Sequence, residues 1–453
     1  MEIVNKQRAY FETGATLPVA TRISYLRKLY KTIQTYESEI AQALYEDLGK
    51  SHYEGYMCEI GLCLSELSYI IKHTEKWAKP QKVKTDLAQF HAKSFKVKNP
   101  LGVVLIMSPW NYPFMLTMEP LFGAISAGNC CVVKPSAYSP NTSLVIKKII
   151  EEVFPEEYVA VISGGRKENE ALLNTKFDYI FFTGSVSVGK TVMEKAAKYM
   201  TPFTLELGGK SPCIVDETAN VKVAAKRIVF GKLLNCGQTC VAPDYILVHK
   251  QVKDTFVSAL QLEITKTYGK KPLKNPNFGK IINQKHFERL LGLIDEKKVI
   301  FGGKSDADAL KIEPTILNNV SLDDAVMQEE IFGPILPVIT FDTFREAENI
   351  IKSFEHPLAA YLFSNDVKRQ KYFMHHMIFG GGCINDCIVH LATSRMPFGG
   401  VGASGMGKYH GKYSFDTFSH EKGMLKRYNW MDLPMRYQPY QKYGMYLLKL
   451  FLK

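Results

Sequence analysis

The chain has 453 residues, of which 46% are hydrophobic and 23% are charged, and its formal net charge at pH 7 is +12. A single core usually stops growing before this length, so two or three domains are expected. Lysines and arginines are spread along the whole chain, without an arginine-rich arm or zinc-finger spacing, which argues against nucleic-acid binding. The basic excess is better explained as an attraction for anionic cofactor phosphates.

No apolar stretch reaches the ~20 residues that span a bilayer. Residues 1–10 lack the apolar segment of a signal peptide, so we expect a cytoplasmic protein. In that reducing compartment the nine cysteines, an odd number, should be free thiols. Most free cysteines are small buried apolar residues, so the useful question is whether one of them is reactive.

Hydrophobic periodicity divides the chain into regions. Residues 17–48 carry apolar side chains at three- and four-residue steps, which predicts helices in the first ~75 residues. Around residues 77–100 polar and apolar side chains alternate in short runs, which predicts an extended arm rather than core. The last ~60 residues are glycine-rich and then basic and aromatic.

From residue 101 onward, short apolar runs are bounded by Gly, Pro or Asn and followed by helical stretches such as 143–153 and 189–199; the runs are 102–107, 130–133 and 179–182. Buried strands that alternate with helices predict a parallel, doubly wound sheet. A second α/β unit is expected over residues 211–390, with strands at 212–215, 245–248 and 335–339.

Cys240 lies in the segment Asn-Cys-Gly-Gln-Thr-Cys-Val-Ala-Pro (235–243), after a predicted helix over 223–234. The flanking Gly, Gln and Thr leave the backbone close to whatever the sulfur touches. A thiol here is a nucleophile if its pKa is lowered. The alternative, which the local sequence alone favours, is a buried structural cysteine. Cys236 is expected to pack, and a redox pairing with Cys240 is the less favoured alternative.

Glu206 stands between Leu205 and Leu207 at the end of a predicted strand that runs into a Gly-Gly turn. An acid between two leucines is expected to be partly desolvated, which raises its pKa toward the range of a general base. The alternative is a solvent-facing glutamate on an alternating strand.

Asn111 is held in the segment Pro-Trp-Asn-Tyr-Pro (109–113), which follows the first apolar strand. Loop residues at the carboxyl end of a parallel strand commonly face a ligand. The side-chain amide is therefore a candidate donor to an oxyanion, with a turn-stabilising asparagine as the alternative.

Three further segments suit a dinucleotide cofactor. Residues 182–185, followed by Gly189, form a strand–turn–helix pattern that places phosphates at a helix N-terminus, although it is not the G-x-G-x-x-G fingerprint. Lys134 ends another predicted strand. It is a candidate contact for a phosphate or a ribose, with a surface lysine as the alternative. Residues 329–334 combine two glutamates with an aromatic residue, which suits a ribose clamp or a helix C-terminus. We expect no metal, because the cysteine pairs 236/240 and 383/387 lack histidine partners.

Six of these segments occur in the order and spacing of the aldehyde dehydrogenase superfamily, and the chain resembles that family over essentially its full length; the segments are 109–111, 182–185, 205–210, 237–240, 329–334 and 397–400. The short N-terminus, the residues Ala242–Tyr245 and the segment 405–411 are similar to the class-3 branch, which includes bacterial members. The resemblance implies an α/β fold with a Rossmann-type cofactor domain, an α/β catalytic domain, a small β oligomerisation arm, and a homodimer.

The resemblance also implies residue roles. Cys240 is the nucleophile, Asn111 and the Cys240 backbone N–H form the oxyanion hole, and Glu206 activates water. The implied cofactor contacts are Lys134, Ser136, Ala137, Gly184, Ser185, Gly189, Leu207, Glu330 and Phe332. Trp110, Tyr112 and Phe398 are expected to line an apolar pocket, which suits aliphatic and aromatic aldehydes equally.

One position departs from many NAD-using relatives. They carry a glutamate that accepts hydrogen bonds from the adenosine ribose, where this chain has Ala137. Without that carboxylate a 2′-phosphate is not repelled, and Lys134 is nearby. Acceptance of NADP alongside NAD is therefore expected.

Two rival functions are less favoured. Acylating relatives, which pass the acyl group to coenzyme A, typically lack the deacylating acid, whereas Glu206 is present. A non-catalytic binding protein on the same scaffold would usually have lost the nucleophile or the base, and Cys240, Glu206 and Asn111 are all intact.

The expected division of the chain is a dinucleotide-binding domain (1–80 and 99–205), a catalytic domain (206–392), an oligomerisation arm with bridging segments (81–98 and 393–430) and a basic amphipathic tail (431–453). We expect the tail to pack on the dimer or lie in solvent, with membrane contact as the less favoured alternative.

Overall fold

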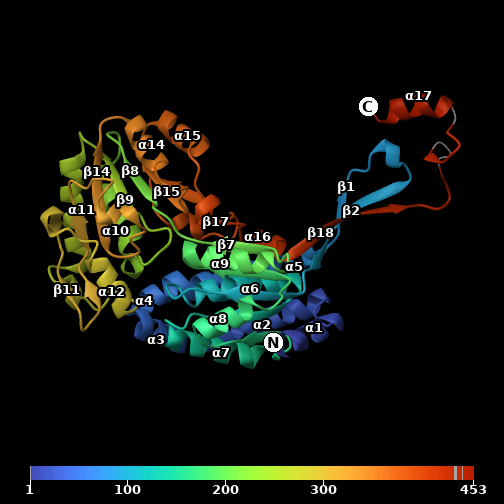
Figure 1. Ribbon diagram of the computed structural model, residues 1–453, viewed down its shortest axis with the longest axis horizontal. Helices are drawn as coiled ribbons and strands as arrows, with labels where there is room; N and C mark the ends of the chain where they lie inside the picture. The colour runs from blue at the N-terminus through green and yellow to red at the C-terminus, as the bar shows by residue number, and fades with distance from the viewer. Residues whose placement is uncertain (1, 433–435, 441, 453) are drawn as a thin grey trace.

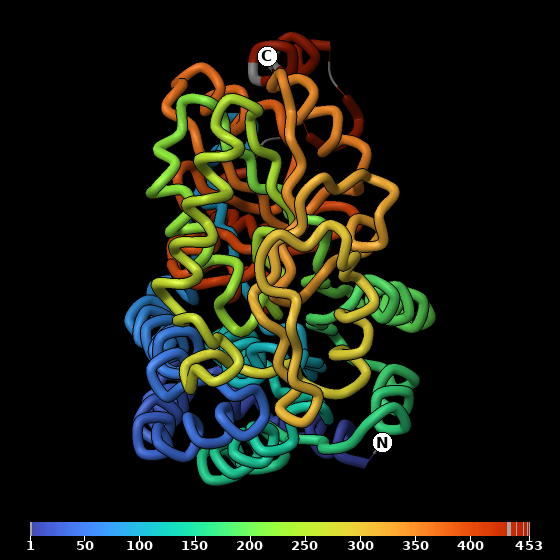
Figure 2. The backbone as a smooth tube through the Cα atoms, turned by 90° about the vertical axis from the view of Figure 1, so that its left-hand side faces the viewer, coloured from blue at the N-terminus to red at the C-terminus, as the bar shows by residue number. Residues whose placement is uncertain are grey.

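The computed structural model describes residues 2–432, 436–440 and 442–452. Figure 1 shows a two-lobed body from which a slender arm projects, with the C-terminal helix beyond the tip of the arm. In the side view of Figure 2, the N-terminal part in blue and teal lies beneath the part in green, yellow and orange. Within the described ranges, no helix is both long and apolar enough to cross a membrane.

The N-terminal region is helical, as the periodicity predicts, because each helix buries one apolar stripe and exposes its charged face. Its elements are α1 (Glu2–Glu12), α2 (Val19–Thr35), α3 (Glu37–Leu48), α4 (His52–Gly55), the π-helical turn η1 (Tyr56–Ile60) and α5 (Gly61–Ala78). Gly49 ends α3 with a φ of 67°, a left-handed conformation that favours glycine.

A six-stranded sheet in the order β17-β7-β6-β3-β4-β5 forms the first lobe. Its interior strands are parallel, and β3, β4 and β6 are buried at every residue, which explains their uninterrupted apolar sequences. The strands are β3 (Val103–Met107), β4 (Cys130–Lys134), β5 (Val159–Val161), β6 (Tyr179–Thr183), β7 (Phe203–Glu206) and the antiparallel edge strand β17 (Gly405–Met406). The helices are α6 (Met115–Ala127), α7 (Pro140–Val153), α8 (Arg166–Leu173) and α9 (Val186–Ala197).

A seven-stranded sheet in the order β10-β13-β14-β9-β8-β15-β16 forms the second lobe. Its strands are β8 (Pro212–Val215), β9 (Tyr245–His249), β10 (Val299–Phe301), β13 (Thr315–Leu317), β14 (Ile335–Phe341), β15 (Ala359–Phe363) and β16 (Gly381–Ile384), with the separate pair β11 (Ser305–Asp306) and β12 (Lys311–Ile312). Its helices are α10 (Val221–Leu233), α11 (Lys253–Tyr268), α12 (Gln284–Leu291), α13 (Ala325–Gln328), α14 (Phe344–Lys352) and α15 (Val367–His376). Short 3-10 turns are η3 (Leu234–Gly237), η4 (Pro272–Lys274), η5 (Glu296–Lys298), η6 (Val389–Leu391) and η7 (Gly402–Ser404). The predicted α/β class with parallel interior strands is confirmed.

The arm is a three-stranded antiparallel sheet of β1 (Gln81–Val83), β2 (Ala92–Pro100) and β18 (Ser419–Arg427), with η2 (Leu87–Gln89) at the hairpin. β18 pairs with β2 along nine residue pairs, from Ser419↔Pro100 to Arg427↔Ala92. Helix α16 (Gly411–Thr417) leads into the arm, and α17 (Lys442–Phe451) follows it (Figure 1). The predicted tail, 431–453, includes residues 433–435, 441 and 453, which lie outside the described residues.

Several predicted helix limits are wrong: α7 begins at Pro140 rather than residue 143, α9 ends at Ala197 rather than residue 199, and α10 begins at Val221 rather than residue 223. The helix expected over 189–199 begins at Val186, because Ser185 caps it by accepting a hydrogen bond from the Val188 N–H. The helix expected to end at Leu234 ends at Leu233, where the backbone turns into a left-handed pair of residues. Cys240 therefore lies on a loop well beyond the helix end.

Candidate active site

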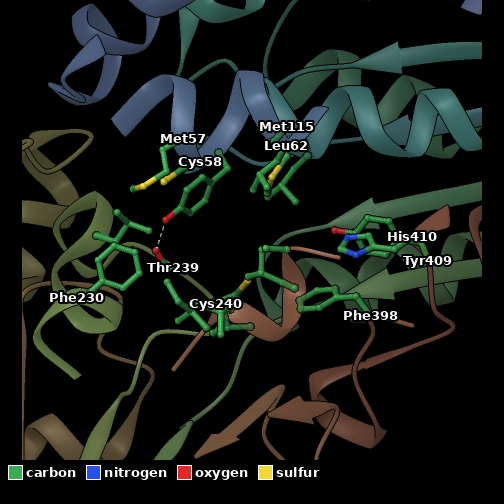
Figure 3. A pocket seen from close by; sticks show the side chains of 18 residues that line it. Met57, Cys58, Leu62, Met115, Phe230, Thr239, Cys240, Phe398, Tyr409 and His410 are labelled. Carbon is green, nitrogen blue, oxygen red and sulfur yellow. Dashed lines mark hydrogen bonds between the residues drawn. The ribbon is translucent and has the colours of Figure 1, made fainter. Parts of the chain in front are cut away.

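Cys240 lies where two cavities meet, each of about 320 Å³. One cavity is apolar and is lined by side chains such as Met115, Phe230 and Val241 (Figure 3). The other is more polar and contains the Asn111, Glu206 and Glu330 side chains. Among the residues that the structure describes, only Cys240 and Leu116 line both cavities, so the sulfur stands at the junction between a site for an apolar group and a site for a polar one.

The loop that carries Cys240 is held by a strained backbone. Asn235 and Cys236 have φ values of 51° and 53°, which non-glycine residues adopt rarely. Gly237 also has a positive φ, and a Cβ there would lie 2.2 Å from the carbonyl oxygen of Gly333, so a side chain cannot be accommodated. Such strain persists only where surrounding contacts fix the conformation, which is typical of functional sites.

Gln238 supplies much of that fixation. Its side-chain N–H groups donate to the carbonyl oxygens of Asn235 (3.1 Å) and Lys280 (3.0 Å), and its side-chain oxygen accepts from the Ile282 N–H (3.0 Å). The amide is fully buried and uses both ends, so it ties the Cys240 loop to a distant segment.

The surroundings of Cys240 favour the protonated thiol. Burial, followed by the nearby carboxylates Glu330 and Glu206, raises its pKa to about 12. The backbone N–H groups of Cys240 and Val241 act in the opposite sense, because they stabilise the thiolate. A positive charge brought into the polar cavity would lower the pKa and activate the sulfur.

Glu206 ends β7 with a side chain that is only 2% exposed. Neither carboxylate oxygen has a hydrogen-bond partner among the described residues. Burial alone raises the pKa of this carboxyl well above its usual value, as the flanking leucines suggested. A desolvated acid facing the same cavity as the sulfur can take a proton from a water molecule there.

Asn111 donates one of its two side-chain N–H groups to the carbonyl oxygen of Gln238 (3.0 Å), two residues before Cys240. The bond holds the amide in the polar cavity that the sulfur also lines, where its second N–H can donate to an oxygen atom bound there. An amide held in this way can serve as a donor to an oxyanion.

Replacing Asn111 with alanine should lower the rate of the first chemical step by on the order of 10²–10³-fold, because one donor to the developing oxyanion is lost. The measurement is single-turnover formation of reduced cofactor. Cofactor affinity should stay near that of the wild type. An unchanged single-turnover rate would show that this amide is only a loop support.

Several predicted cofactor residues surround the polar cavity, namely Gly184, Ser185, Leu207, Glu330 and Phe332. Burial, followed by the charge of Asp244, raises the pKa of Glu330 to about 8. The Glu330 carboxylate lies so close to the backbone of Gly208 that a Cβ there would lie 2.1 Å from it, so a side chain at this position would displace the carboxylate.

The other four predicted cofactor residues do not line the polar cavity. Lys134 is buried at the end of β4 and donates to the Pro135 carbonyl oxygen (2.8 Å), and burial lowers its pKa. Ala137 is exposed and Ser136 half-buried in the same turn. Gly189 is buried inside α9, where a Cβ would lie 2.8 Å from Leu207, so it allows helix packing rather than lining the cavity.

The predicted aromatic pocket is divided between the cavities. Tyr112 and Phe398 line the apolar cavity, as expected. Trp110 does not: its ring packs against His286 (5.0 Å) and Phe332 (5.4 Å) and lines the polar cavity. The backbone bends at residues 110–112 rather than running as a strand, so Trp110 and Tyr112 face different cavities and cannot be grouped by sequence proximity.

Two basic residues that hold the backbone of residues 326–331 were not predicted from the sequence. Lys210 pairs with Asp244 (2.6 Å) and donates to the carbonyl oxygens of Val326 and Glu329. Arg289, which lines the polar cavity, donates to the carbonyl oxygens of Glu330 and Ile331. No local pattern distinguishes these residues from surface charges; only the loop they hold would have pointed to them.

Fold and site together are those of a dehydrogenase that uses a cysteine nucleophile. The chain belongs to the aldehyde dehydrogenase family, whose family model matches residues 1–424. It is 48% identical over 446 residues to the 4,4'-diaponeurosporen-aldehyde dehydrogenase of Staphylococcus aureus, covering 98% of this chain and 97% of the relative. It is 44% identical over 452 residues to aldehyde dehydrogenase family 3 member H1 of Arabidopsis thaliana, covering 99% and 93%.

Solved structures agree. The substrate-bound state of Staphylococcus aureus AldH superposes with a TM-score of 0.98 at 48% identity, covering 100% of this chain and 99% of that chain. An NAD+ complex of aldehyde dehydrogenase from Bacillus cereus gives 0.85 at 28% identity, covering 94% and 88%. The predicted family, its class-3 branch and the activity are confirmed: the chain is an enzyme that oxidises aldehydes to carboxylic acids with NAD(P).

Proposed function

We propose that this enzyme oxidises apolar aldehydes, with Cys240 as nucleophile, Asn111 as oxyanion donor and Glu206 as the base for hydrolysis. The observation that carries the proposal is the position of the sulfur, between an apolar cavity and a polar cavity that contains the other two side chains.

The residues divide the reaction between them. The Cys240 thiol gives its proton to water, the sulfur attacks the carbonyl carbon, and the C=O electron pair moves to the oxygen, which accepts a hydrogen bond from the Asn111 amide. When bound, NAD(P) supplies the hydride acceptor for this carbon, which leaves a thioester on the sulfur. Glu206 then takes a proton from water, whose oxygen attacks the thioester carbon. The carboxylic acid is released and the sulfur recovers its electron pair.

The polar cavity fits the nicotinamide end of such a cofactor. Glu330 offers a buried carboxylate that can accept hydrogen bonds from ribose hydroxyls, and Gly208 leaves room for it. Gly184 and Ser185 lie at the start of α9, a helix N-terminus that favours negatively charged groups.

The apolar cavity supports aldehydes with a long apolar chain. Its wall consists almost entirely of carbon and sulfur atoms from residues including Met57, Leu62, Phe230 and Ile388. The relative in Staphylococcus aureus is named for a diaponeurosporen aldehyde. Each buried methylene contributes about 0.8 kcal/mol.

The activity test is formation of reduced cofactor at 340 nm with hexanal, decanal and benzaldehyde. We expect kcat/KM to rise from hexanal to decanal, because four additional methylenes enter the apolar cavity. A preference for short or charged aldehydes would contradict the proposed substrate class.

We also propose that the enzyme accepts NADP as well as NAD. Ala137 is exposed beside the end of β4, so no carboxylate stands at this position to repel a 2′-phosphate. Replacing Ala137 with glutamate should lower kcat/KM for NADP more than for NAD, since like charges repel. A strong NAD preference of the wild-type enzyme in the same assay would contradict the proposal, and Ala137→Gln is the uncharged control.

Finally, we propose a cytoplasmic homodimer joined through the arm. All nine cysteines are free thiols, in keeping with a reducing compartment. Exposed apolar side chains of the arm and tail include Phe90, Met424, Leu425, Trp430 and Met445. We propose that a second subunit, rather than a membrane, covers these side chains. Light scattering of the full chain measures the mass of the particle in solution, which should be that of a dimer.

A further inference from the structure

A buried ion pair lies beneath the loop that carries Asn111. Lys50 follows α3 and Glu59 belongs to η1. Their side chains are completely buried, and the Lys50 Nζ lies 2.5 Å from a Glu59 carboxylate oxygen. Burying two charges has a desolvation cost that mutual attraction often fails to recover, so a well-packed apolar pair would fill the same space at least as well. The hydrogen bonds that the pair makes to the Asn111 loop suggest a role beyond filling this space.

Both partners hold the backbone of the same loop. The Lys50 Nζ donates to the Asn111 carbonyl oxygen (2.9 Å) and lies 3.9 Å from the centre of the Tyr112 ring. The second Glu59 carboxylate oxygen accepts from the N–H groups of Phe114 (2.9 Å) and Met115 (3.1 Å), where α6 begins. The pair therefore fixes the loop from the Asn111 carbonyl group to the start of α6.

The loop is in turn joined to the loop of the nucleophile. The Asn235 side-chain amide donates to the carbonyl oxygens of Asn111 (2.7 Å) and Gln238 (3.1 Å). The Asn111 amide donates to the same Gln238 oxygen (3.0 Å), and the Tyr112 hydroxyl contacts the Thr239 hydroxyl (2.6 Å; Figure 3). Lys50 and Glu59 line neither cavity, so they can affect the reaction only through these contacts.

We infer that Lys50 and Glu59 are positioning residues for the first chemical step, which hold the Asn111 amide at the distance from the Cys240 sulfur that oxyanion binding requires. The inference rests on the proposed role of Asn111. It gives the N-terminal helical region a part in catalysis, because residues 50 and 59 lie far outside the segments that carry the reacting groups.

The test uses a charge-neutral double variant, Lys50→Met with Glu59→Gln, because a single neutral substitution would leave one buried charge unpaired. The glutamine keeps an acceptor for the α6 N–H groups, whereas the methionine cannot donate to the Asn111 carbonyl oxygen. We expect single-turnover formation of reduced cofactor to slow by ~10–100-fold, as a small displacement of a catalytic group does. Cofactor dissociation constants should be unchanged.

The same double variant is then placed in an Asn111→Ala background. If the pair acts through Asn111, it should slow that enzyme little further. An equal loss in both backgrounds, or no loss in either, overturns the inference. An Asn111→Ala enzyme as fast as the wild type would instead remove the proposed role of Asn111, so the two failures are distinguishable.

Two further variants exclude a general loss of stability. Arg369→Met with Asp216→Asn removes another ion pair that includes a fully buried carboxylate and lines neither cavity, together with the Arg369 contacts to Glu217 and Asp366, and should leave the single-turnover rate unchanged. Glu59→Asp keeps the charge but shortens the side chain, so it cannot hold Lys50 and both N–H groups at once. It should slow the same step while the protein remains folded, and a wild-type rate in this variant also overturns the inference.

Discussion

Replacing Cys240 with alanine is expected to reduce aldehyde oxidation by on the order of 10⁴–10⁶-fold, because no other thiol stands at the junction of the two cavities. Without the sulfur the carbonyl carbon cannot form the covalent adduct from which the hydride leaves. Cofactor affinity and the melting temperature should change little, because the polar cavity keeps its carboxylates. Steady-state assays at 340 nm measure the activity, cofactor titrations measure the affinity, and thermal unfolding measures the melting temperature.

The matched control is Cys58→Ala. Cys58 lines the apolar cavity together with Cys240, and burial raises its pKa to about 12 as well. It lies on the wall opposite Cys240 (Figure 3) and does not line the polar cavity, so its loss should leave most of the activity. Full activity of the Cys240 variant, or inactivity of the Cys58 variant alone, would show that Cys240 is not the nucleophile.

Replacing Glu206 with glutamine should separate the two halves of the reaction. Attack and hydride transfer do not need this carboxylate, so a burst of about one equivalent of reduced cofactor per active site should form. Hydrolysis of the thioester should slow by on the order of 10²–10⁴-fold, the usual contribution of a general base. Rapid-mixing absorbance at 340 nm gives the burst, and peptide mass spectrometry locates the acyl group on Cys240.

The pH dependence follows from the same burial. Burial raises the pKa of Glu206 well above its usual value, so the base form is lost as pH falls and gained as pH rises. Wild-type deacylation should therefore accelerate toward alkaline pH, and the glutamine variant should lose this dependence. Hydroxylamine, which attacks thioesters without a base, should restore its turnover. A variant without a burst would mean that Glu206 acts before hydride transfer.

The fold could be predicted because its main signal is local. Strands β3, β4 and β6 are buried on both faces, so their sequences are apolar without interruption. Limits of elements depend on weaker signals: Ser185 moves the start of α9 upstream through one capping bond. The register of β2 with β18 could not be predicted, since the strands lie more than 300 residues apart and pair only in the folded arm.

The candidate site was accessible from sequence where a residue type has little other use. The acid between leucines and the asparagine between aromatic residues made Glu206 and Asn111 candidates with open alternatives, and only the family resemblance implied their roles. Trp110 was misplaced because its direction is set by His286 and Phe332, far along the chain. Lys50 and Glu59 gave no signal at all, since a lysine and a glutamate near helices usually form a solvated surface.

The most direct test of the central claim is the product balance of the wild-type enzyme with decanal and no coenzyme A. We predict one decanoic acid for each reduced NAD or NADP formed, and complete loss of both products in Cys240→Ala. Absence of acid unless coenzyme A is added, or acid formed without Cys240, would contradict the account of a cysteine thioester hydrolysed with the help of Glu206.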